Sequence, residues 1–128
     1  MAPIRVLVVD DEEELVSALT ERLELRGFDA RGATSGTEAL ETLATAMWDV
    51  VVVDIRMPGI DGLDLARRIR GEHPDTAVVL LTGRSSVRDA EEGLALGASE
   101  YLVKPVPIDR LARVLREASG RERDAGDE

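Results

Sequence analysis

Four short apolar segments of this sequence are followed or ended by polar residues that can do chemistry. These residues supply three carboxylates, one hydroxyl and one ammonium, and they are Asp10, Asp11, Asp54, Thr82 and Lys104. If these segments are parallel strands, their carboxyl ends meet at one edge of a sheet. Open α/β sheets bind their ligands at that edge. The pattern therefore predicts a polar site assembled from distant parts of the chain.

The three carboxylates predict a cation site. Carboxylates that share a site repel one another, and each then favours its protonated form. A hard divalent cation removes that repulsion, and Mg²⁺ fits best because it takes one or two carboxylates, keeps several waters and bridges to phosphate oxygens. The segment after Asp10 has neither Gly-x-Gly-x-x-Gly nor a Walker lysine motif. The residues thus predict a site for a cation and, through it, a phosphoryl group, without a nucleotide cradle.

Asp54 is the candidate nucleophile of this site. It precedes the sequence Ile-Arg-Met-Pro-Gly, a loop that leaves its carboxylate accessible. A carboxylate can attack phosphorus and form an acyl phosphate. The transition state spreads negative charge over the phosphoryl oxygens, and Mg²⁺, the Lys104 ammonium and the Thr82 hydroxyl would each interact with part of that charge.

The elements that must position these residues alternate along the chain. The strand candidates are short runs rich in Val and Leu, as expected for buried parallel strands, at residues 5–10, 28–33, 49–54, 77–82 and 99–103. Segments with helical period follow each run. Ser35 to Glu38 form a capping box, Gly71 and Pro74 are expected to end the third helix, and Pro107 opens the fifth. The order predicts an α/β, doubly wound (βα)₅ fold.

Length and composition limit the possible functions. A chain of 128 residues predicts one domain, over residues 1–120. Residues 121–128 carry charge without apolar period and indicate a tail, or the start of a linker to an absent effector domain. The lack of cysteine excludes a disulfide scaffold, a cysteine metal site and a thiol nucleophile.

Net charge and aromatic content argue against nucleic acid partners, and the short apolar runs argue against a membrane span. The net charge of −10 and the single Phe, Trp and Tyr make direct nucleic acid binding by this domain unexpected. No apolar run approaches the length of a membrane span. The first residues lack signal-peptide features, so the expected location is the cytoplasm.

Four segments in order resemble the receiver domain of two-component response regulators: VLVVDDEEEL, VVVDIRMPGIDGLDL, VVLLTG and GASEYLVKP. The likeness runs from about residue 5 to residue 118, and the spacing from Asp54 to Lys104 also suits the family. Each motif alone is weak, but the set in this order is specific. The resemblance implies a CheY-like, flavodoxin-like parallel sheet of order 2-1-3-4-5.

The resemblance also implies the phosphoacceptor and the metal ligands. Asp54 would accept a phosphoryl group from a histidine of a sensor kinase or a histidine phosphotransfer protein. Asp11 and Asp54 would ligate Mg²⁺ directly, and Asp10 would act through a water. The backbone carbonyl of Arg56 would be the third protein ligand.

Further roles follow from the same resemblance. Lys104 would pair with the phosphoryl group, and Thr82 would hydrogen-bond to it. Tyr101 would turn inward as Thr82 moves. The Lys104–Pro105 peptide bond would be cis. Arg56 and Arg84 lie two residues after Asp54 and Thr82, and we expect them to modulate the lifetime of the acyl phosphate by shaping access to the site.

The expected function is a signalling switch that catalyses only its own phosphorylation and dephosphorylation. Phosphorylation would alter the face made by the fourth helix, the fifth strand and the fifth helix, and with it an output partner or a homodimer. The output itself is not visible in the sequence.

Several alternatives compete with this interpretation. Asp10 and Asp11 could simply cap a helix, as could Thr82, and Tyr101 could be a packing residue. A haloacid-dehalogenase-type phosphatase would need a second aspartate where Glu12 stands. A flavodoxin-like electron carrier would need a Ser-, Thr- and Gly-rich loop in place of the acidic run after the first strand. A receiver-like module that binds a partner without phosphorylation also remains open.

Overall fold

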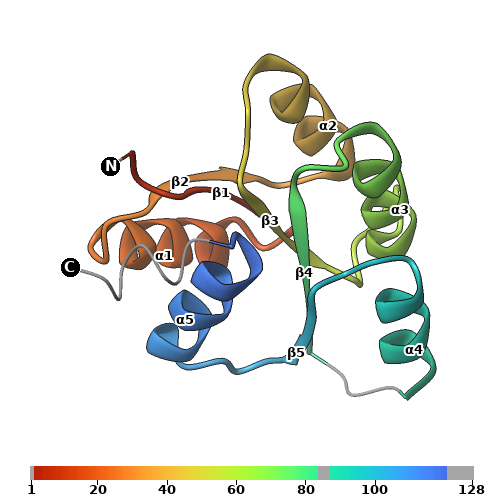
Figure 1. Ribbon diagram of the computed structural model, residues 1–128. Coiled ribbons are helices and arrows are strands. Elements are labelled where there is room, and N and C mark those ends of the chain that lie inside the picture. Colours follow the sequence, from red (N-terminus) through yellow and green to blue (C-terminus); the bar gives the residue numbers. More distant parts are fainter. Residues whose placement is uncertain (1, 84–86, 121–128) are drawn as a thin grey trace.

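The computed structural model describes residues 2–83 and 87–120, and within these ranges five strands alternate with five helices (Figure 1). The strands are β1 (Arg5–Val9), β2 (Asp29–Ala33), β3 (Val50–Asp54), β4 (Ala77–Thr82) and β5 (Glu100–Val103). The helices are α1 (Glu13–Glu24), α2 (Gly36–Thr45), α3 (Gly62–Glu72), α4 (Val87–Ala95) and α5 (Ile108–Ala118).

All neighbouring strands pair in parallel, in the order β2-β1-β3-β4-β5. The predicted doubly wound (βα)₅ fold and its 2-1-3-4-5 order are therefore confirmed. Each predicted strand lies within one residue of its observed ends. Asp10 follows β1 instead of ending it, and its backbone N–H still donates to the carbonyl oxygen of Ala33 at 3.2 Å.

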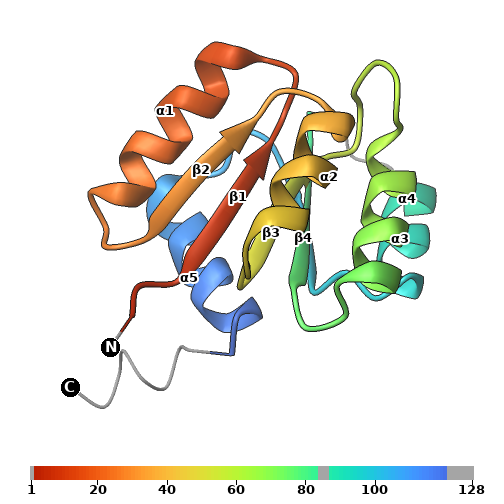
Figure 2. The ribbon, with the colours of Figure 1, turned by 90° about the horizontal axis from the view of Figure 1, so that it is seen from above.

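Two hydrophobic layers hold the helices against the sheet, with α1 and α5 on one face and α2, α3 and α4 on the other (Figure 2). Successive side chains of a strand point to opposite faces, so a wholly apolar strand contributes to both layers. In β3, Val51 and Val53 pack in the layer with α2 and α3, whereas Val50 and Val52 pack in the layer with α1 and α5. This double burial explains the unbroken valine run.

The helix ends follow the sequence signals with one difference. Ser35 caps α2, because its hydroxyl oxygen accepts from the backbone N–H of Glu38 at 3.1 Å. The third helix was expected to end at Gly71 and Pro74, but α3 continues through Gly71 to Glu72. The N–H of His73 still donates to the carbonyl of Ile69 at 2.7 Å. Glycine weakens a helix but keeps its N–H, whereas proline cannot continue one.

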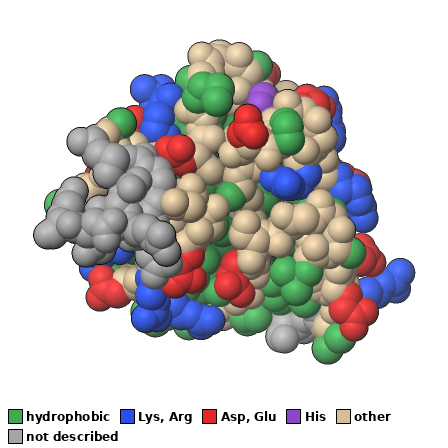
Figure 3. Space-filling view, in the orientation of Figure 1, with side chains coloured by type: hydrophobic (Ala, Val, Ile, Leu, Met, Phe, Trp, Pro, Cys, Tyr) green, Lys and Arg blue, Asp and Glu red, His purple; other side chains and the backbone are tan. Residues whose placement is uncertain are grey.

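One face of the described surface carries intermixed charges. On the face shown in Figure 3, Lys and Arg side chains lie among acidic ones and form no broad basic area. Among the described residues, no helix is long and apolar enough to cross a membrane. The predicted tail at residues 121–128 and the predicted modulator Arg84 lie outside the described ranges.

Candidate functional site

The carboxyl edge of the sheet brings the predicted acidic residues together. β1 and β3 are adjacent, with Val9 opposite Val53, so the residues that follow them meet at this edge. One carboxylate oxygen from each of Asp10, Asp11 and Asp54 lies within 4.8 Å of the other two. Asp10 is only 1% exposed and Asp54 5% exposed, whereas Asp11 is open to solvent.

Lys104 supplies a positive charge next to the two buried carboxylates of the site. Its Nζ donates to Oδ2 of Asp10 at 2.7 Å and lies 3.6 Å from Oδ2 of Asp54. The N–H of Lys104 donates to the carbonyl of Thr82 at 2.7 Å, which fixes the end of β5 against β4. The Lys104–Pro105 peptide bond is cis. Lys104 is also the only lysine of the chain.

The second oxygen of each buried carboxylate accepts from a backbone N–H. Oδ1 of Asp10 accepts from the N–H of Glu12 at 3.0 Å, and Oδ1 of Asp54 accepts from the N–H of Arg56 at 3.2 Å. Hydrogen bonds of this kind fix the orientation of a carboxylate that burial has deprived of water. The two carboxylates are thus held in place by the loops that follow their own strands.

Burial and neighbouring charges shift the pKa values of two groups of this site, Asp54 and Lys104. Burial raises the pKa of Asp54 above its ordinary value, and the charges of Asp10 and Asp11 act in the same direction, against the lowering effects of the Arg56 N–H and of Lys104. Burial would lower the pKa of Lys104, but its hydrogen bond to Asp10 and the nearby carboxylates outweigh burial, so this pKa is raised. Lys104 is therefore held as a cation beside Asp54, and the ionised form of Asp54 is the disfavoured one.

An open cavity of about 470 Å³ lies over Asp54 and is lined by Glu12, Arg56, Gly83 and Lys104 as well. It exposes the Asp54 carboxylate to a reactant from solvent. Oxygen donors clustered at its base match the preference of Mg²⁺ for carboxylate ligands. The donor set thus fits the expected cation, and the cavity leaves room for a phosphoryl group beside it.

Thr82 and Tyr101 lie on the same face of the sheet, and neither is among the residues that line the cavity. Thr82 is fully buried at the end of β4, opposite Val103 of β5. Tyr101 lies two residues before Val103 and packs, half-buried, against the layer that contains Leu80 of β4. Alternation along the strands therefore places both side chains on the sheet face that α4 covers.

Two residues that the sequence reasoning did not single out contribute to this site. Asp89 of α4 forms an ion pair with Arg56, with Oδ2 at 3.2 Å from Nη2. Gly62, the first residue of α3, lies so close to β3 that a Cβ there would overlap the carbonyl oxygen of Asp54. The Asp61–Gly62 pair before an amphipathic run could have indicated the start of α3. No local signal could have indicated the contact with Asp89.

The strand order and the acidic cluster define a doubly wound α/β domain with a candidate cation site at its carboxyl edge. The family model described as the response regulator receiver domain matches residues 6–116. The chain belongs to this family, as its motifs indicated.

Named relatives and solved structures agree with this assignment. The transcriptional regulatory protein TrcR of Mycobacterium tuberculosis is 40% identical over 97% of this chain and 50% of its own length. The receiver domain structure from Clostridium thermocellum is 34% identical, with a TM-score of 0.85 over 95% of this chain and 98% of its own. The regulator TrrA of Thermotoga maritima, solved with Mg²⁺-BeF, is 37% identical, with a TM-score of 0.81 over 90% and 98%. The chain spans about half the length of the first curated relatives that it matches.

Proposed function

We propose that this domain is the phosphoacceptor of a two-component signalling pathway and that Asp54 receives the phosphoryl group. The observation that carries this proposal is the position of Asp54, at the base of an open cavity between two further carboxylates and the Lys104 ammonium. The donor would be a phosphohistidine of a sensor kinase or of a histidine phosphotransfer protein, as membership of the family implies.

The transfer requires one bond to form and one to break. An oxygen of the Asp54 carboxylate forms a bond to phosphorus while the phosphorus–nitrogen bond of the phosphohistidine breaks. The electron pair of that bond stays on the imidazole nitrogen, which takes up a proton. The product is an acyl phosphate. Later attack by water on phosphorus restores the carboxylate and releases inorganic phosphate, so the domain catalyses only its own phosphorylation and dephosphorylation.

The acidic residues would hold the cation that this transfer needs. Asp11, Asp54 and the backbone carbonyl of Arg56 would bind Mg²⁺ directly, and Asp10 would bind it through a water. Bound Mg²⁺ neutralises negative charge on the phosphoryl oxygens. Support for this assignment comes from the clustered carboxylate oxygens and from the Mg²⁺-BeF complex of the relative TrrA.

Lys104 and Thr82 would bind the transferred group. The Lys104 ammonium already lies 3.6 Å from Asp54 Oδ2, so a phosphoryl oxygen on Asp54 comes within its reach. Thr82 ends the neighbouring strand, and its hydroxyl would hydrogen-bond to another phosphoryl oxygen. Tyr101, on the same face of the sheet as Thr82, would turn inward as Thr82 moves.

The output surface would be the face formed by α4, β5 and α5. Val87 and Leu94 of α4 and Val103 of β5 are exposed hydrophobic residues of these elements. Apolar side chains left in water favour a partner that covers them. A change at Thr82 and Tyr101 would alter this face and thus favour an output protein or domain, or a second copy of the chain. The names of the curated relatives support a transcriptional output.

Intact-mass measurement after incubation with Mg²⁺ and acetyl phosphate tests the proposal. We expect one added phosphoryl group in the wild type, and none without Mg²⁺ or in Asp54→Asn. Some receivers require their own kinase, so beryllofluoride with Mg²⁺ serves as a second probe. If neither the mass nor the spectrum of the protein changes, the proposal fails and a module that binds without phosphorylation replaces it.

A further inference from the structure

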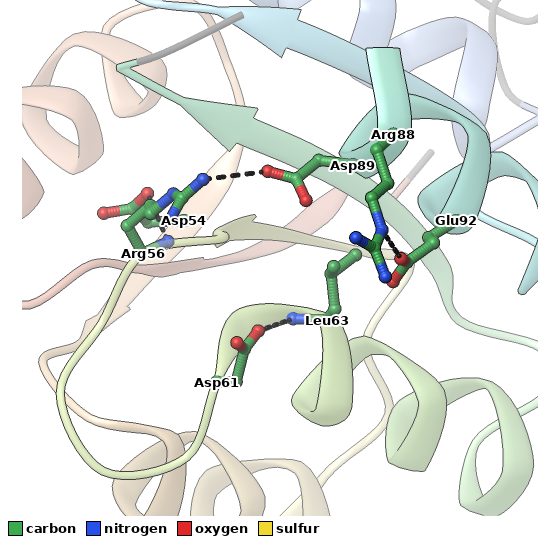
Figure 4. A network of polar contacts seen from close by, with 7 residues as sticks. All are labelled: Asp54, Arg56, Asp61, Leu63, Arg88, Asp89 and Glu92. Carbon is green, nitrogen blue, oxygen red and sulfur yellow. Dashed lines mark hydrogen bonds and ion pairs between the residues drawn. The ribbon is translucent and has the colours of Figure 1, made fainter. Parts of the chain in front are cut away.

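Arg56 separates two hollows of the surface. One is the cavity over Asp54, and the other, of about 390 Å³, is lined by Ile55, Met57, Asp61, Leu63 and Asp89 together with Arg56. Figure 4 shows Arg56 beside Asp54, with its guanidinium directed toward Asp89 of α4. The main chain of Arg56 donates to Asp54 Oδ1, while its side chain holds Asp89. One residue thus contacts the candidate phosphoacceptor and the first turn of α4 at once.

The neighbouring ion pairs of α4 do not reach the site. Arg88 pairs with Glu92 within α4 at 3.2 Å, and Glu92 lies 3.8 Å from Arg67 of α3. The first contact stays within α4, and the second joins α4 to α3 about one turn after Asp89. The pair between Arg56 and Asp89 joins α4 to the loop that follows Asp54. Among the described residues, it is therefore a direct contact through which a change at Asp54 can act on α4.

Arg56 can leave Asp89 and bind another anion in its place. Nη2 of Arg56 lies 3.2 Å from Oδ2 of Asp89, and the Arg56 side chain is 61% exposed while that of Asp89 is 17% exposed. Because the guanidinium of Arg56 lies largely in solvent, its pairing with Asp89 is weakened by water and salt. A phosphoryl group on Asp54 would present several anionic oxygens beside Arg56, and guanidinium binds phosphate strongly, often through two parallel hydrogen bonds.

We propose that Asp89 is a positioning residue for Arg56, which holds the guanidinium on α4 while Asp54 is unmodified and releases it to the phosphoryl group afterwards. This inference rests on the proposed function of Asp54. Phosphorylation then withdraws the Arg56 guanidinium from Asp89 and loosens the first turn of α4 from the loop after β3. By linkage, α4 in turn affects the affinity of the site for a phosphoryl group, because coupling between two sites is reciprocal.

A double-mutant cycle with beryllofluoride and Mg²⁺ as the probe tests this exchange. The affinities of the wild type, Asp89→Asn, Arg56→Ala and the double variant are compared. We expect Asp89→Asn to tighten binding by about two- to fivefold, because Arg56 no longer leaves a partner to reach the ligand. In the Arg56→Ala background, the same Asp89→Asn substitution should have no effect. Glu92→Gln is the matched control, because it removes one negative charge from α4 and leaves the Arg56–Asp89 pair intact.

Hydrogen exchange of residues 87–95 gives a second readout that a loss of overall stability would not imitate. In the wild type, we expect the ligand to increase exchange in the first turn of α4. In Asp89→Asn, exchange there should be high before the ligand is added. Equal tightening in the Arg56→Ala background, or equal tightening by Glu92→Gln, would mean a general charge effect and would overturn the inference. An unchanged affinity in Asp89→Asn would also overturn it. If the wild type neither binds beryllofluoride nor forms the Asp54 adduct, the proposed function fails first.

Discussion

Lys104 lies closer to Asp10 than to the candidate phosphoacceptor Asp54. Its Nζ is 2.7 Å from Asp10 Oδ2 and 3.6 Å from Asp54 Oδ2. The shorter of the two ion pairs of Lys104 therefore joins the end of β5 to the end of β1. Asp10 is almost fully buried, and a buried carboxylate needs a partner of opposite charge.

We expect Lys104→Gln to destabilise the protein by about 1–3 kcal/mol, because Asp10 loses its cationic partner and remains buried. Lys104→Arg keeps the charge and should retain most of that stability. The guanidinium differs in shape from the ammonium, so phosphorylation should still fall in Lys104→Arg. Urea denaturation in EDTA measures the first effect, and intact mass after acetyl phosphate treatment the second. Equal stability of Lys104→Gln and wild type would contradict this account.

Asp54→Asn should stabilise the protein at pH 7 in EDTA. Burial raises the pKa of Asp54 from 3.8, with Asp10 and Asp11 as further causes. A carboxyl with a raised pKa binds its proton more tightly in the folded state. Its contribution to stability is present below pH 3.8 and is lost as pH rises through the raised pKa. The asparagine side chain does not titrate, so the Asp54→Asn variant does not lose this stability as pH rises.

Urea denaturation across this pH range checks the sign. The difference between Asp54→Asn and the wild type should grow as pH rises above 3.8 and then level off. Asp64→Asn is a suitable control, since its exposed carboxylate lies on α3 outside the site. A wild type that gains stability over Asp54→Asn as pH rises would refute the expected direction.

If Mg²⁺ binds the folded acidic cluster and not the unfolded chain, as we propose, it should stabilise the wild type. At ten times its dissociation constant, the gain is about 1.4 kcal/mol. Asp11→Asn removes one of the three clustered carboxylates and should reduce the gain. Thermal unfolding with and without Mg²⁺ measures it, and Glu13→Gln controls for the loss of a nearby exposed charge. An identical response of Asp11→Asn and wild type would place the cation elsewhere.

Gly62→Ala should destabilise the protein by about 1–3 kcal/mol and lower the yield of phosphorylation. The added Cβ would overlap the carbonyl oxygen of Asp54 and the Cα of Ile55, and backbone atoms cannot move aside as a flexible side chain can. Gly71→Ala is the control within α3, because its Cβ would enter open space. That variant should gain roughly 0.5–1 kcal/mol from better helix propensity. Chemical denaturation of both variants should therefore give shifts of opposite sign.

The fluorescence of Trp48 should report unfolding and respond little to Mg²⁺. Trp48 is 4% exposed, donates from Nε1 to the carbonyl of Thr42 at 3.3 Å and is stacked by Arg5 at 4.4 Å. It precedes β3, whereas Asp54 ends that strand, about 17–20 Å away by strand rise. Strong quenching by Mg²⁺ that is lost in Asp54→Asn would show that the two ends of β3 are coupled.

Much of the fold could be predicted because its signals are local. Buried parallel strands need apolar residues on both faces, so apolar runs such as 50–53 and 77–81 can be recognised as strands from the sequence. The polar residues that end these runs are therefore predictable as neighbours at one edge of the sheet. The exact end of α3 was not predictable, because the glycine and the proline near it were two competing stop signals.

The sequence by itself determined the order of the elements and the residue types at the carboxyl edge, including the three carboxylates and the lysine. Only the tertiary structure decided that Lys104 pairs most closely with Asp10, that Arg56 reaches Asp89 and that Gly62 lies against the carbonyl of Asp54. The physical reason is the range of the interactions. Strand and helix patterns repeat over a few residues, whereas these contacts join residues from different elements and depend on how α3, α4 and β5 pack on the sheet.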